Sequence, residues 1–549
     1  MVNAQGDTTH FVTQADSRGA RHHWKFVIAL ILVTLIFRLV FLAGPVGSDD
    51  TRYMDAAWKV AYGQPAGLMD NAYVRAAWII WLAGWTKLGL GGTALVFTQV
   101  LVSIGLVLTL YWLGRKLTGD PRAAFLGALC WVFFPIELTY AGMVLPDEFA
   151  VLLVLLAAGL ALAALRAPEQ QPKPLHLIAA GILCGVAVSV KEPYALVPAI
   201  LGIWALWEIR PLRVALRRSV AIGVISVTTF ALEYPFFRLW TGDWMYRHHV
   251  LRGIYGPGGK ISTEEHVTSS SLLYYSRGVL LNPAICGLFG WLLLIGALYA
   301  LRKVKEAKFI AIWSVAFFLF LQFGSTTISR YQPLPMQPRY ALPIVVLLFI
   351  PLGKWLADVV GSPQFGPVGT ALLLAALTLQ GVMAVDADAA QGLYSANIPR
   401  AVQRTLGMAR IELPCGIALP KALVSYLPPD LKIRTDCWSK LELNQHLDIS
   451  ELGQLRDRHI AILIPNDLAR IPSAQTDYPV LMTWLNQNAV SVPVADGVAF
   501  LDRFYLATGI SALKRRAKTA VIAKLYVFEG SAHDALSRAS QPSDASGLR

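Results

Sequence analysis

Residues 26–53 read FVIALILVTLIFRLVFLAGPVGSDDTRY, an apolar run that ends in two adjacent acids. The apolar part, 26–43, has the ~18 residues that an α-helix needs to cross the hydrocarbon core of a bilayer. Asp49 and Asp50 follow where this helix is expected to leave the bilayer. The pair is a candidate general base or ligand that meets substrate at the membrane face. The alternative is two solvated loop carboxylates that end the helix.

The composition indicates a membrane protein. Of the 549 residues, 55% are hydrophobic and only 15% are charged, which is typical of a polytopic membrane protein. The net charge is +13, but the basic residues lie mainly in short loops, where an anionic leaflet attracts them, so nucleic acid is not an expected partner. No small-residue cleavage motif follows the first apolar run, which is therefore expected to remain as an anchor. The sequence contains no phosphate-binding loop, dinucleotide-binding glycine pattern or zinc motif.

Hydropathy predicts about eleven transmembrane helices. Basic residues fill four of the loops between them, and all four loops fall on one side if the N-terminus is cytoplasmic. Residues 1–25 are then a cytoplasmic tail, 44–92 and 237–283 are long outer loops, and the C-terminal part is extracytoplasmic. The predicted fold class is an α-helical polytopic membrane protein with a transmembrane domain over 26–390. The spans after the first are expected near 93–113, 123–141, 148–166, 175–190, 194–209, 219–236, 284–301, 309–323, 340–357 and 367–385.

Residues 391–530 have a different pattern. Short β-rich runs such as CGIALP at 415–420 alternate with helical ones, which predicts a small C-terminal extracytoplasmic α/β domain. Cys415 and Cys437 fall in this domain and are candidates for a disulfide if the compartment is oxidising. The alternative is two buried thiols on neighbouring strands. Residues 531–549 are polar and are predicted to be disordered.

Ionisable residues recur where predicted spans meet the outer face. Charges at membrane depth are costly and usually line a cavity or pair with one another, so their number on one side predicts a polar cavity there. Single members have alternatives: Arg38 and Arg339 are long enough to reach headgroups, and Glu148 suits the positive end of a helix dipole. Lys191 and Glu192 are alternatively a self-neutralising turn pair. The positions are Arg38, Asp147, Glu148, Lys191, Glu192, Glu233 and Arg339.

The outer loop 237–283 mixes aromatic, basic and glycine residues, and we interpret it as a lid over this cavity. Its tryptophans, such as Trp240, suit either stacking on a sugar or the headgroup belt. The histidines His248, His249 and His266 lack the His-x-x-x-His spacing that places two ligands on one helix face, so no metal site is predicted.

Several short motifs stand in order along the outer side of the chain. They are Asp49-Asp50, Tyr53 and Arg75 in the first loop, Pro146-Asp147, Lys191-Glu192, Glu233 before Thr241-Gly242-Asp243 and Arg247, and Arg339-Tyr340 before Pro343. Over about 26–390 this order resembles the GT-C glycosyltransferases of the protein mannosyltransferase and lipid A aminoarabinose transferase type. Relatives often keep two prolines after the loop arginine, where this chain has Ala76 and Ala77.

The resemblance implies a GT-C fold and an enzyme of the outer membrane face. Such enzymes move a sugar, here hexosyl or pentosyl, from a polyprenyl-phosphate carrier to an acceptor that is a glycan, a lipid or a protein. The resemblance also implies the cytoplasmic (inner) membrane of a bacterium. Some GT-C enzymes use a divalent cation and others do not, so no cofactor is certain.

Residue roles follow from the same resemblance. Asp49 is expected to take the proton of the acceptor hydroxyl, with Asp50 or Asp147 as its helper. The charge of the carrier phosphate is expected to meet basic groups at the membrane face. These groups are Lys191, Arg339 and Arg75, and the other expected substrate-binding residues are Arg52, Tyr53, Glu192, Glu233 and Tyr340.

Two other classes of function compete with the transferase. A transporter or flippase of a lipid-linked sugar would also need a charged cavity, but it would be expected to carry inverted repeats and polar residues near the middle of the bilayer. A membrane scaffold whose outer domain binds a partner would need no acidic pair after the first span. The discriminating observation is whether a sugar becomes covalently attached to an acceptor.

Overall fold

The computed structural model describes residues 9–40, 49–66, 71–90, 95–170, 173–255, 273–282, 285–300, 302–325 and 337–362, with short stretches elsewhere up to residue 528. The chain divides into two compact units. The first comprises Met1–Leu42 and Ala56–Val385, and the second comprises Ala43–Asp55 and Asp386–Arg549.

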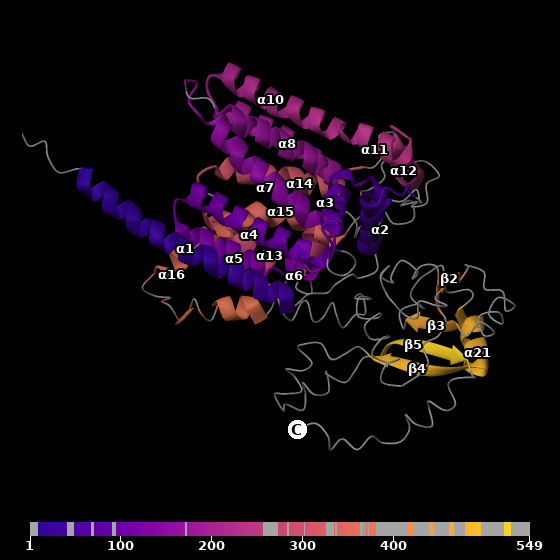
Figure 1. Cartoon of the computed structure of the whole chain (residues 1–549). Helices are drawn as coiled ribbons and strands as arrows, with labels where there is room; N and C mark the ends of the chain where they lie inside the picture. The colour runs from indigo at the N-terminus through magenta and orange to yellow at the C-terminus, as the bar shows by residue number, and fades with distance from the viewer. Residues whose placement is uncertain are drawn as a thin grey trace, which may run out of the picture. The chain divides into compact units, whose positions relative to one another are not determined.

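Five helices of the first unit lie side by side (Figure 1). In order across the bundle they are α10 (Leu212–Ala231), α8 (Pro174–Val190), α7 (Pro146–Leu165), α4 (Val96–Thr118) and α1 (Thr9–Val40). Most side chains of α7 are buried on all its faces, which is the pattern of an apolar helix enclosed by its neighbours. Helix α7 is therefore central to the bundle, and its first turn carries Asp147 and Glu148.

Shorter helices complete the first unit. Pro135 starts α6 (Pro135–Tyr140) directly after α5 (Pro121–Val132), so the span predicted at 123–141 is two helices rather than one. The other helices described in this unit, with α2 shared between the units, are α2 (Asp49–Ala61), α3 (Ala76–Lys87), α9 (Leu196–Glu208), α11 (Glu233–Thr241), α12 (Tyr246–Tyr255), α13 (Phe289–Ala300), α14 (Ala307–Phe323), α15 (Leu342–Val345) and α16 (Phe349–Val360), with the short segments η1 (Asn71–Val74), η3 (Glu192–Ala195), η6 (Tyr274–Leu280), η7 (Pro338–Ala341) and η8 (Val346–Leu348).

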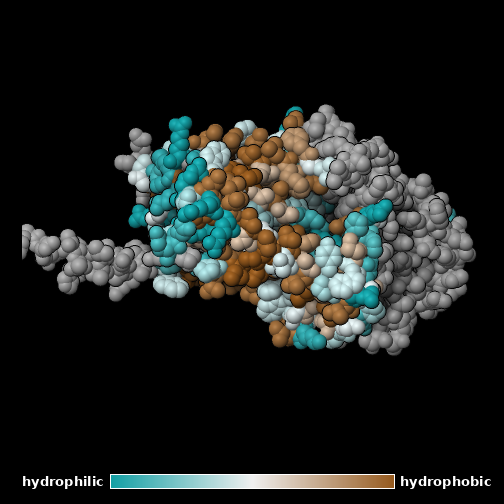
Figure 2. Space-filling view, turned by 90° about the horizontal axis from the view of Figure 1, so that it is seen from above, coloured by the Kyte–Doolittle hydropathy of each residue, from teal (hydrophilic) through white to brown (hydrophobic). Residues whose placement is uncertain are grey.

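Among the described residues, four helical segments are long and apolar enough to cross a membrane. They are Val96–Thr118, Pro146–Leu165, Leu212–Thr241 and Pro338–Val360, and four shorter apolar helices accompany them. Figure 2 shows a hydrophobic belt across the helical part beside a hydrophilic end. The fold is thus a multi-pass helical bundle, while the number of about eleven spans stays a prediction. Helix α1 already begins at Thr9, inside the predicted tail.

The second unit contains a mixed five-stranded sheet in the order β2-β1-β3-β5-β4. Strand β1 pairs in parallel with β2 and β3, whereas β5 pairs antiparallel with β3 and β4. The sheet and one helix agree with the predicted alternation, but the extracytoplasmic side of this domain stays a prediction. Cys415 and Cys437 lie outside the described residues, so the disulfide between them stays a prediction. The elements are β1 (Gly416–Pro420), β2 (Ser439–Leu443), β3 (Ile460–Pro465), α21 (Tyr478–Asn488), β4 (Ala489–Ala495) and β5 (Val521–Phe528).

Helices α5 and α16 meet through two glycines. A Cβ atom on Gly353 would overlap the backbone oxygen of Ala123, and one on Gly127 would overlap that of Phe349. The two backbones therefore approach each other closely, which residues without a side chain allow inside a membrane. This contact holds α16 against the bundle, and α16 follows the segment η7, which carries Arg339 and Tyr340, through α15 and η8.

We expect Gly353→Ala to lower the stability of the purified protein by about 1–3 kcal/mol, because overpacking forces the two backbones apart. The matched control is Gly223→Ala on α10, where a Cβ atom meets no other atom within 4 Å. Thermal unfolding of both variants in the same detergent measures the difference. Equal melting temperatures for Gly353→Ala and wild type would contradict the close packing.

Candidate active site

A cluster of charged side chains lies at the start of α7. Lys191, the residue that ends α8, donates from Nζ to Oδ1 of Asp147. Nε of Arg339 lies 3.5 Å from Oδ2 of the same carboxylate. The Asp147 side chain is only 5% exposed and the two basic side chains only 11% each. Two cations therefore share one carboxylate in a largely enclosed place.

Aromatic rings support the two cations of this cluster. Nζ of Lys191 lies 3.6 Å from the centre of the Tyr340 ring. The guanidinium of Arg339 lies 5.5 Å from the same ring and 5.8 Å from the ring of Tyr140. Such contacts stabilise a desolvated cation by about 2 kcal/mol. The rings therefore help to keep positive charge at a site with little water.

Burial lowers the pKa of the Lys191 ammonium to about 8, although the neighbouring Asp147 opposes this shift. Arg339 and Arg75 add to the lowering because their positive charges repel the protonated amine. Lys191 therefore carries its charge at neutral pH but loses it at mildly alkaline pH.

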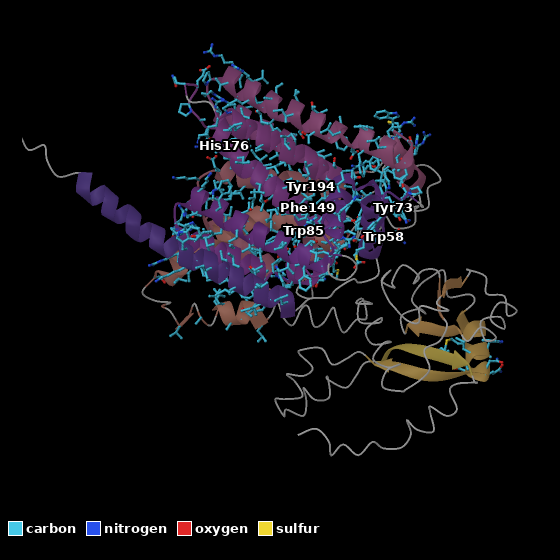
Figure 3. All side chains as sticks on the ribbon, in the orientation of Figure 1. Trp58, Tyr73, Trp85, Phe149, His176 and Tyr194 are labelled. Carbon is cyan, nitrogen blue, oxygen red and sulfur yellow. The ribbon has the colours of Figure 1, made fainter. Side chains whose placement is uncertain are left out.

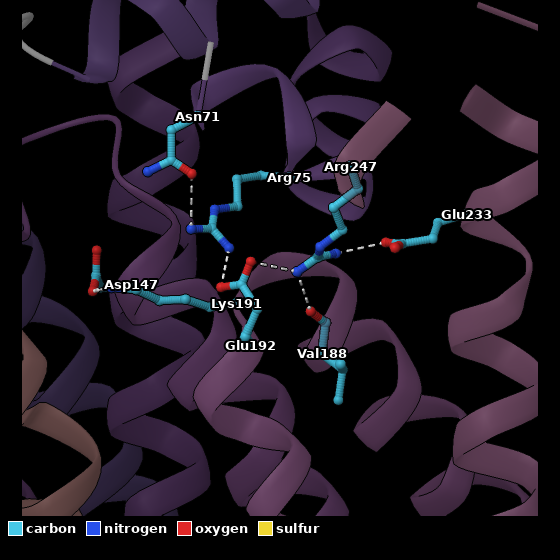
Figure 4. A network of polar contacts seen from close by, with 8 residues as sticks. All are labelled: Asn71, Arg75, Asp147, Val188, Lys191, Glu192, Glu233 and Arg247. Atoms are coloured by element: carbon cyan, nitrogen blue, oxygen red, sulfur yellow. Dashed lines mark hydrogen bonds and ion pairs between the residues drawn. The ribbon is translucent and has the colours of Figure 1, made fainter. Parts of the chain in front are cut away.

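A second set of charges adjoins the first (Figure 4). Glu192 accepts hydrogen bonds from Nη1 of Arg75 and, at 2.8 Å, from Nη2 of Arg247. Arg247 also donates from Nη1 to Oε2 of Glu233 at 2.7 Å, and Arg75 donates to Oδ1 of Asn71 at 3.3 Å. Burial would raise the pKa of the Glu192 carboxyl, but Arg75 and Arg247 outweigh it and hold this pKa well below its usual range. Positive and negative groups thus alternate along this second set.

The backbone between α8 and η3 explains why the two sets are separate. Lys191 is extended, with φ −159° and ψ 129°, and successive side chains of an extended chain point to opposite sides. Lys191 therefore turns toward Asp147, while Glu192 turns toward Arg75 and Arg247. Lys191 and Glu192 therefore bind different partners and do not neutralise each other as a turn pair.

An aromatic stack lies beside the second set. The rings of Trp240 and Tyr73 are 5.8 Å apart and nearly parallel, and Nε1 of Trp240 donates to the Gln64 carbonyl at 3.0 Å. Nζ of Lys59 donates to the Tyr73 hydroxyl at 2.9 Å. Figure 3 shows Tyr73 at the opposite end of the bundle from His176, which lies near the start of α8. The stack thus ties α11 to the segment that leads into Arg75.

The acidic pair Asp49 and Asp50 lies at the start of α2. Asp49 is the first residue of this helix, and the Asp50 side chain is buried, as is that of Tyr53, whereas Arg52 is exposed. All four residues belong to the second compact unit. Their place relative to Lys191 and Arg339 therefore stays a prediction.

Besides Tyr340, which lies against Lys191, the structure brings together six of the sequence-predicted site residues that belong to the first unit. Arg247 belongs to the motif that begins at Glu233, but it was not among the expected site residues. Its spacing from Glu233 is the signal in the sequence that could have identified it. No group of three or more His, Cys, Asp or Glu side chains that could hold a metal ion occurs among the described residues. The six residues are Arg75, Asp147, Lys191, Glu192, Glu233 and Arg339.

Known proteins resemble this chain in sequence and in fold. The family model of dolichyl-phosphate-mannose-protein mannosyltransferase matches residues 74–239. The apo structure of ArnT from Cupriavidus metallidurans is similar over 92% of this chain and 98% of that chain, with 16% sequence identity and a TM-score of 0.53. The chain has the GT-C fold. The resemblance predicted from the motifs is thereby confirmed.

Other solved structures are similar at lower scores. ArnT from Cupriavidus metallidurans bound to undecaprenyl phosphate has 15% identity and a TM-score of 0.48, with 92% of this chain and 98% of that chain covered. The oligosaccharyltransferase of Archaeoglobus fulgidus in complex with zinc and sulfate has 15% identity and a TM-score of 0.47, with 66% of this chain covered. This chain spans about half of the archaeal protein, 52% of its length. A comparison with curated proteins gives no match.

Proposed function

We propose that this GT-C protein is a glycosyltransferase that moves a sugar from a polyprenyl-phosphate carrier to an acceptor at the outer face of a bacterial cytoplasmic membrane. The observation that carries the proposal is the enclosed cluster in which two cations, Lys191 and Arg339, meet one carboxylate, Asp147. The matched family is named for a sugar donor that is a lipid phosphate, and the matched residues include both Asp147 and Lys191. An anionic lipid phosphate is the ligand that this charge and this place in a membrane bundle favour.

The chemistry of transfer suits these groups. The acceptor oxygen forms a bond with the anomeric carbon, and the bond from that carbon to the phosphate oxygen breaks. Negative charge grows on the departing phosphate, and basic groups in a site with little water stabilise it strongly. Lys191 and Arg339 would take this role, with Tyr340 supporting both of them. Asp147 would then set the net charge and the orientation of the two cations.

The proton of the acceptor hydroxyl needs a base. Our proposal keeps Asp49 as this base and Asp50 as its helper, because a partly desolvated carboxylate at the membrane face can take a proton. Arg52 and Tyr53 follow on the same helix and would contact the substrate there. The second set around Glu192 would hold the first outer loop through Arg75, and its polar atoms suit the hydroxyls of a sugar. A sugar that is hexosyl or pentosyl and an acceptor that is a glycan, a lipid or a protein all remain compatible with these groups.

The test of this function uses cells that carry Asp49→Asn. We expect one polyprenyl-phosphate sugar to build up in the variant, with a matching loss from one surface glycan, lipid or protein. Mass spectrometry of extracted lipids and of envelope acceptors measures both changes and identifies both substrates. Asp358→Asn on α16, where the carboxylate binds Lys303 and Lys354 instead, is the control that should resemble wild type.

Two outcomes would contradict the proposal. Unchanged donor lipids together with unchanged acceptors would remove the catalytic role of Asp49. Donor that builds up only on the inner leaflet would instead favour a flippase.

A second prediction follows from the pKa of Lys191. We expect kcat/KM for the lipid-linked donor to fall as pH rises through about 8, because the free protein then loses the Lys191 charge. The variant Lys191→Arg should keep its activity across this range, since arginine stays protonated. Lys308→Arg, in an exposed pair with Glu208, should show the alkaline fall of wild type. The same fall in Lys191→Arg would show that another group titrates.

A further inference from the structure

A further polar cluster, separate from the two sets of the candidate site, is enclosed near the start of α7. Arg38 of α1 donates from Nη2 to Oε1 of Glu137 at 2.9 Å and from Nε to the Ser103 hydroxyl at 2.8 Å. Ser103 in turn donates to the same Glu137 oxygen at 3.1 Å. Glu148, the residue after Asp147, completes the cluster. All four residues are at most 1% exposed.

The cluster contains more carboxyl groups than its cation can neutralise. Arg38 and Ser103 both direct their hydrogen bonds to one oxygen of Glu137. Oε2 of Glu137 and both carboxyl oxygens of Glu148 are fully enclosed and accept no hydrogen bond of normal geometry from the described residues. The Trp131 indole also acts on the Glu137 carboxyl, more weakly than Arg38 and Ser103 do. The charged groups that act on Glu148 are Glu137 on α6, Arg38 on α1 and Asp147 on its own helix, and its carboxyl lies within hydrogen-bond reach of that of Glu137.

A second ionised carboxylate in this place would be very unfavourable. An unpaired buried charge costs several kcal/mol, and a like charge beside it adds to that cost. One proton between the two carboxyls removes both problems, since an acid can donate to a carboxylate oxygen that otherwise receives nothing. Arg38 already pairs with Glu137, so Glu137 is the ionised member and Glu148 is the acid.

We infer that Glu148 is a neutral carboxylic acid in the folded protein, that it donates a hydrogen bond to Oε2 of Glu137, and that it positions Asp147 for the two cations of the candidate site. Successive residues of a helix point about 100° apart. Asp147 therefore faces Lys191, while Glu148 anchors the same turn to α6 and, through Glu137, to Arg38.

The neutral state of Glu148 also controls the charge of the candidate site. With Glu148 protonated, the first turn of α7 brings only the one negative charge of Asp147 to Lys191 and Arg339. An ionised Glu148 next to Asp147 would add a second negative charge near the place proposed for the phosphate, and repulsion from Glu137 would move the turn. This part of the inference rests on the proposed function, whereas the protonation of Glu148 does not.

Infrared spectroscopy tests the proton directly, without any substrate. Exposed Asp and Glu side chains are ionised at neutral pH, so a carbonyl band of a protonated carboxylic acid reports an enclosed one. We expect this band in the full-length protein at pH 7 in a detergent that contains no carbonyl group, a loss of its intensity in Glu148→Gln, and an unchanged band in Glu208→Gln, which removes a carboxylate that binds the exposed Lys308. Glu233 is also buried, and any contribution of its carboxyl to the band is the same in all three proteins. No such band in wild type, or an unchanged band in Glu148→Gln, would overturn the inference.

Donor turnover by the same variants tests the positioning role. Glutamine can donate a hydrogen bond to Glu137 as the acid does, so Glu148→Gln should stay close to wild type in kcat/KM. Alanine cannot, and a displaced Asp147 should cost on the order of 10²-fold in kcat/KM for Glu148→Ala. Equal losses in both variants would overturn the positioning role. If wild type itself transfers no sugar, the proposed function fails, while the infrared result still decides whether Glu148 holds the proton.

Discussion

The site depends on one electrostatic constraint: two cations held around a single carboxylate in a place with little water. A buried ion pair on its own contributes little to stability, because desolvation of both charges offsets their attraction. Lys191 and Arg339 around Asp147 go further than a pair, because two cations share one buried carboxylate. The Tyr340 ring contacts both cations and provides part of the stabilisation that water would otherwise provide. An arrangement of this kind is more readily explained by an anionic ligand than by the stability of the fold.

The rest of the bundle fixes the geometry of these three residues. Asp147 stands on α7, the most buried of the four candidate membrane-spanning segments. The next residue of this helix, Glu148, faces the Glu137 carboxyl of α6. Lys191 is the extended residue between α8 and η3, and its backbone conformation directs Glu192 toward Arg75 and Arg247. The close glycine contact between α5 and α16 holds the helical segment that follows η7.

The sequence predicted the helical membrane class and most of the charged residues that meet in the first unit. It could do so because charges near membrane-spanning segments are rare, and those of this chain recur on one side. It did not predict which charges pair, because Lys191 and Glu192 are neighbours in the chain and only the backbone angle separates them. The role of Glu137 was missed, since one acid within an apolar run gives no sign of its partner.

The most direct test of the account is binding of undecaprenyl phosphate to the purified protein, measured by native mass spectrometry. The account predicts that wild type retains this lipid and that the double variant Lys191→Ala, Arg339→Ala does not. A double variant of two exposed cations, Lys303→Ala and Lys308→Ala, should bind as wild type does. Equal retention by the Lys191 and Arg339 variant and by wild type would show that the carrier phosphate binds elsewhere, and the central claim would be wrong.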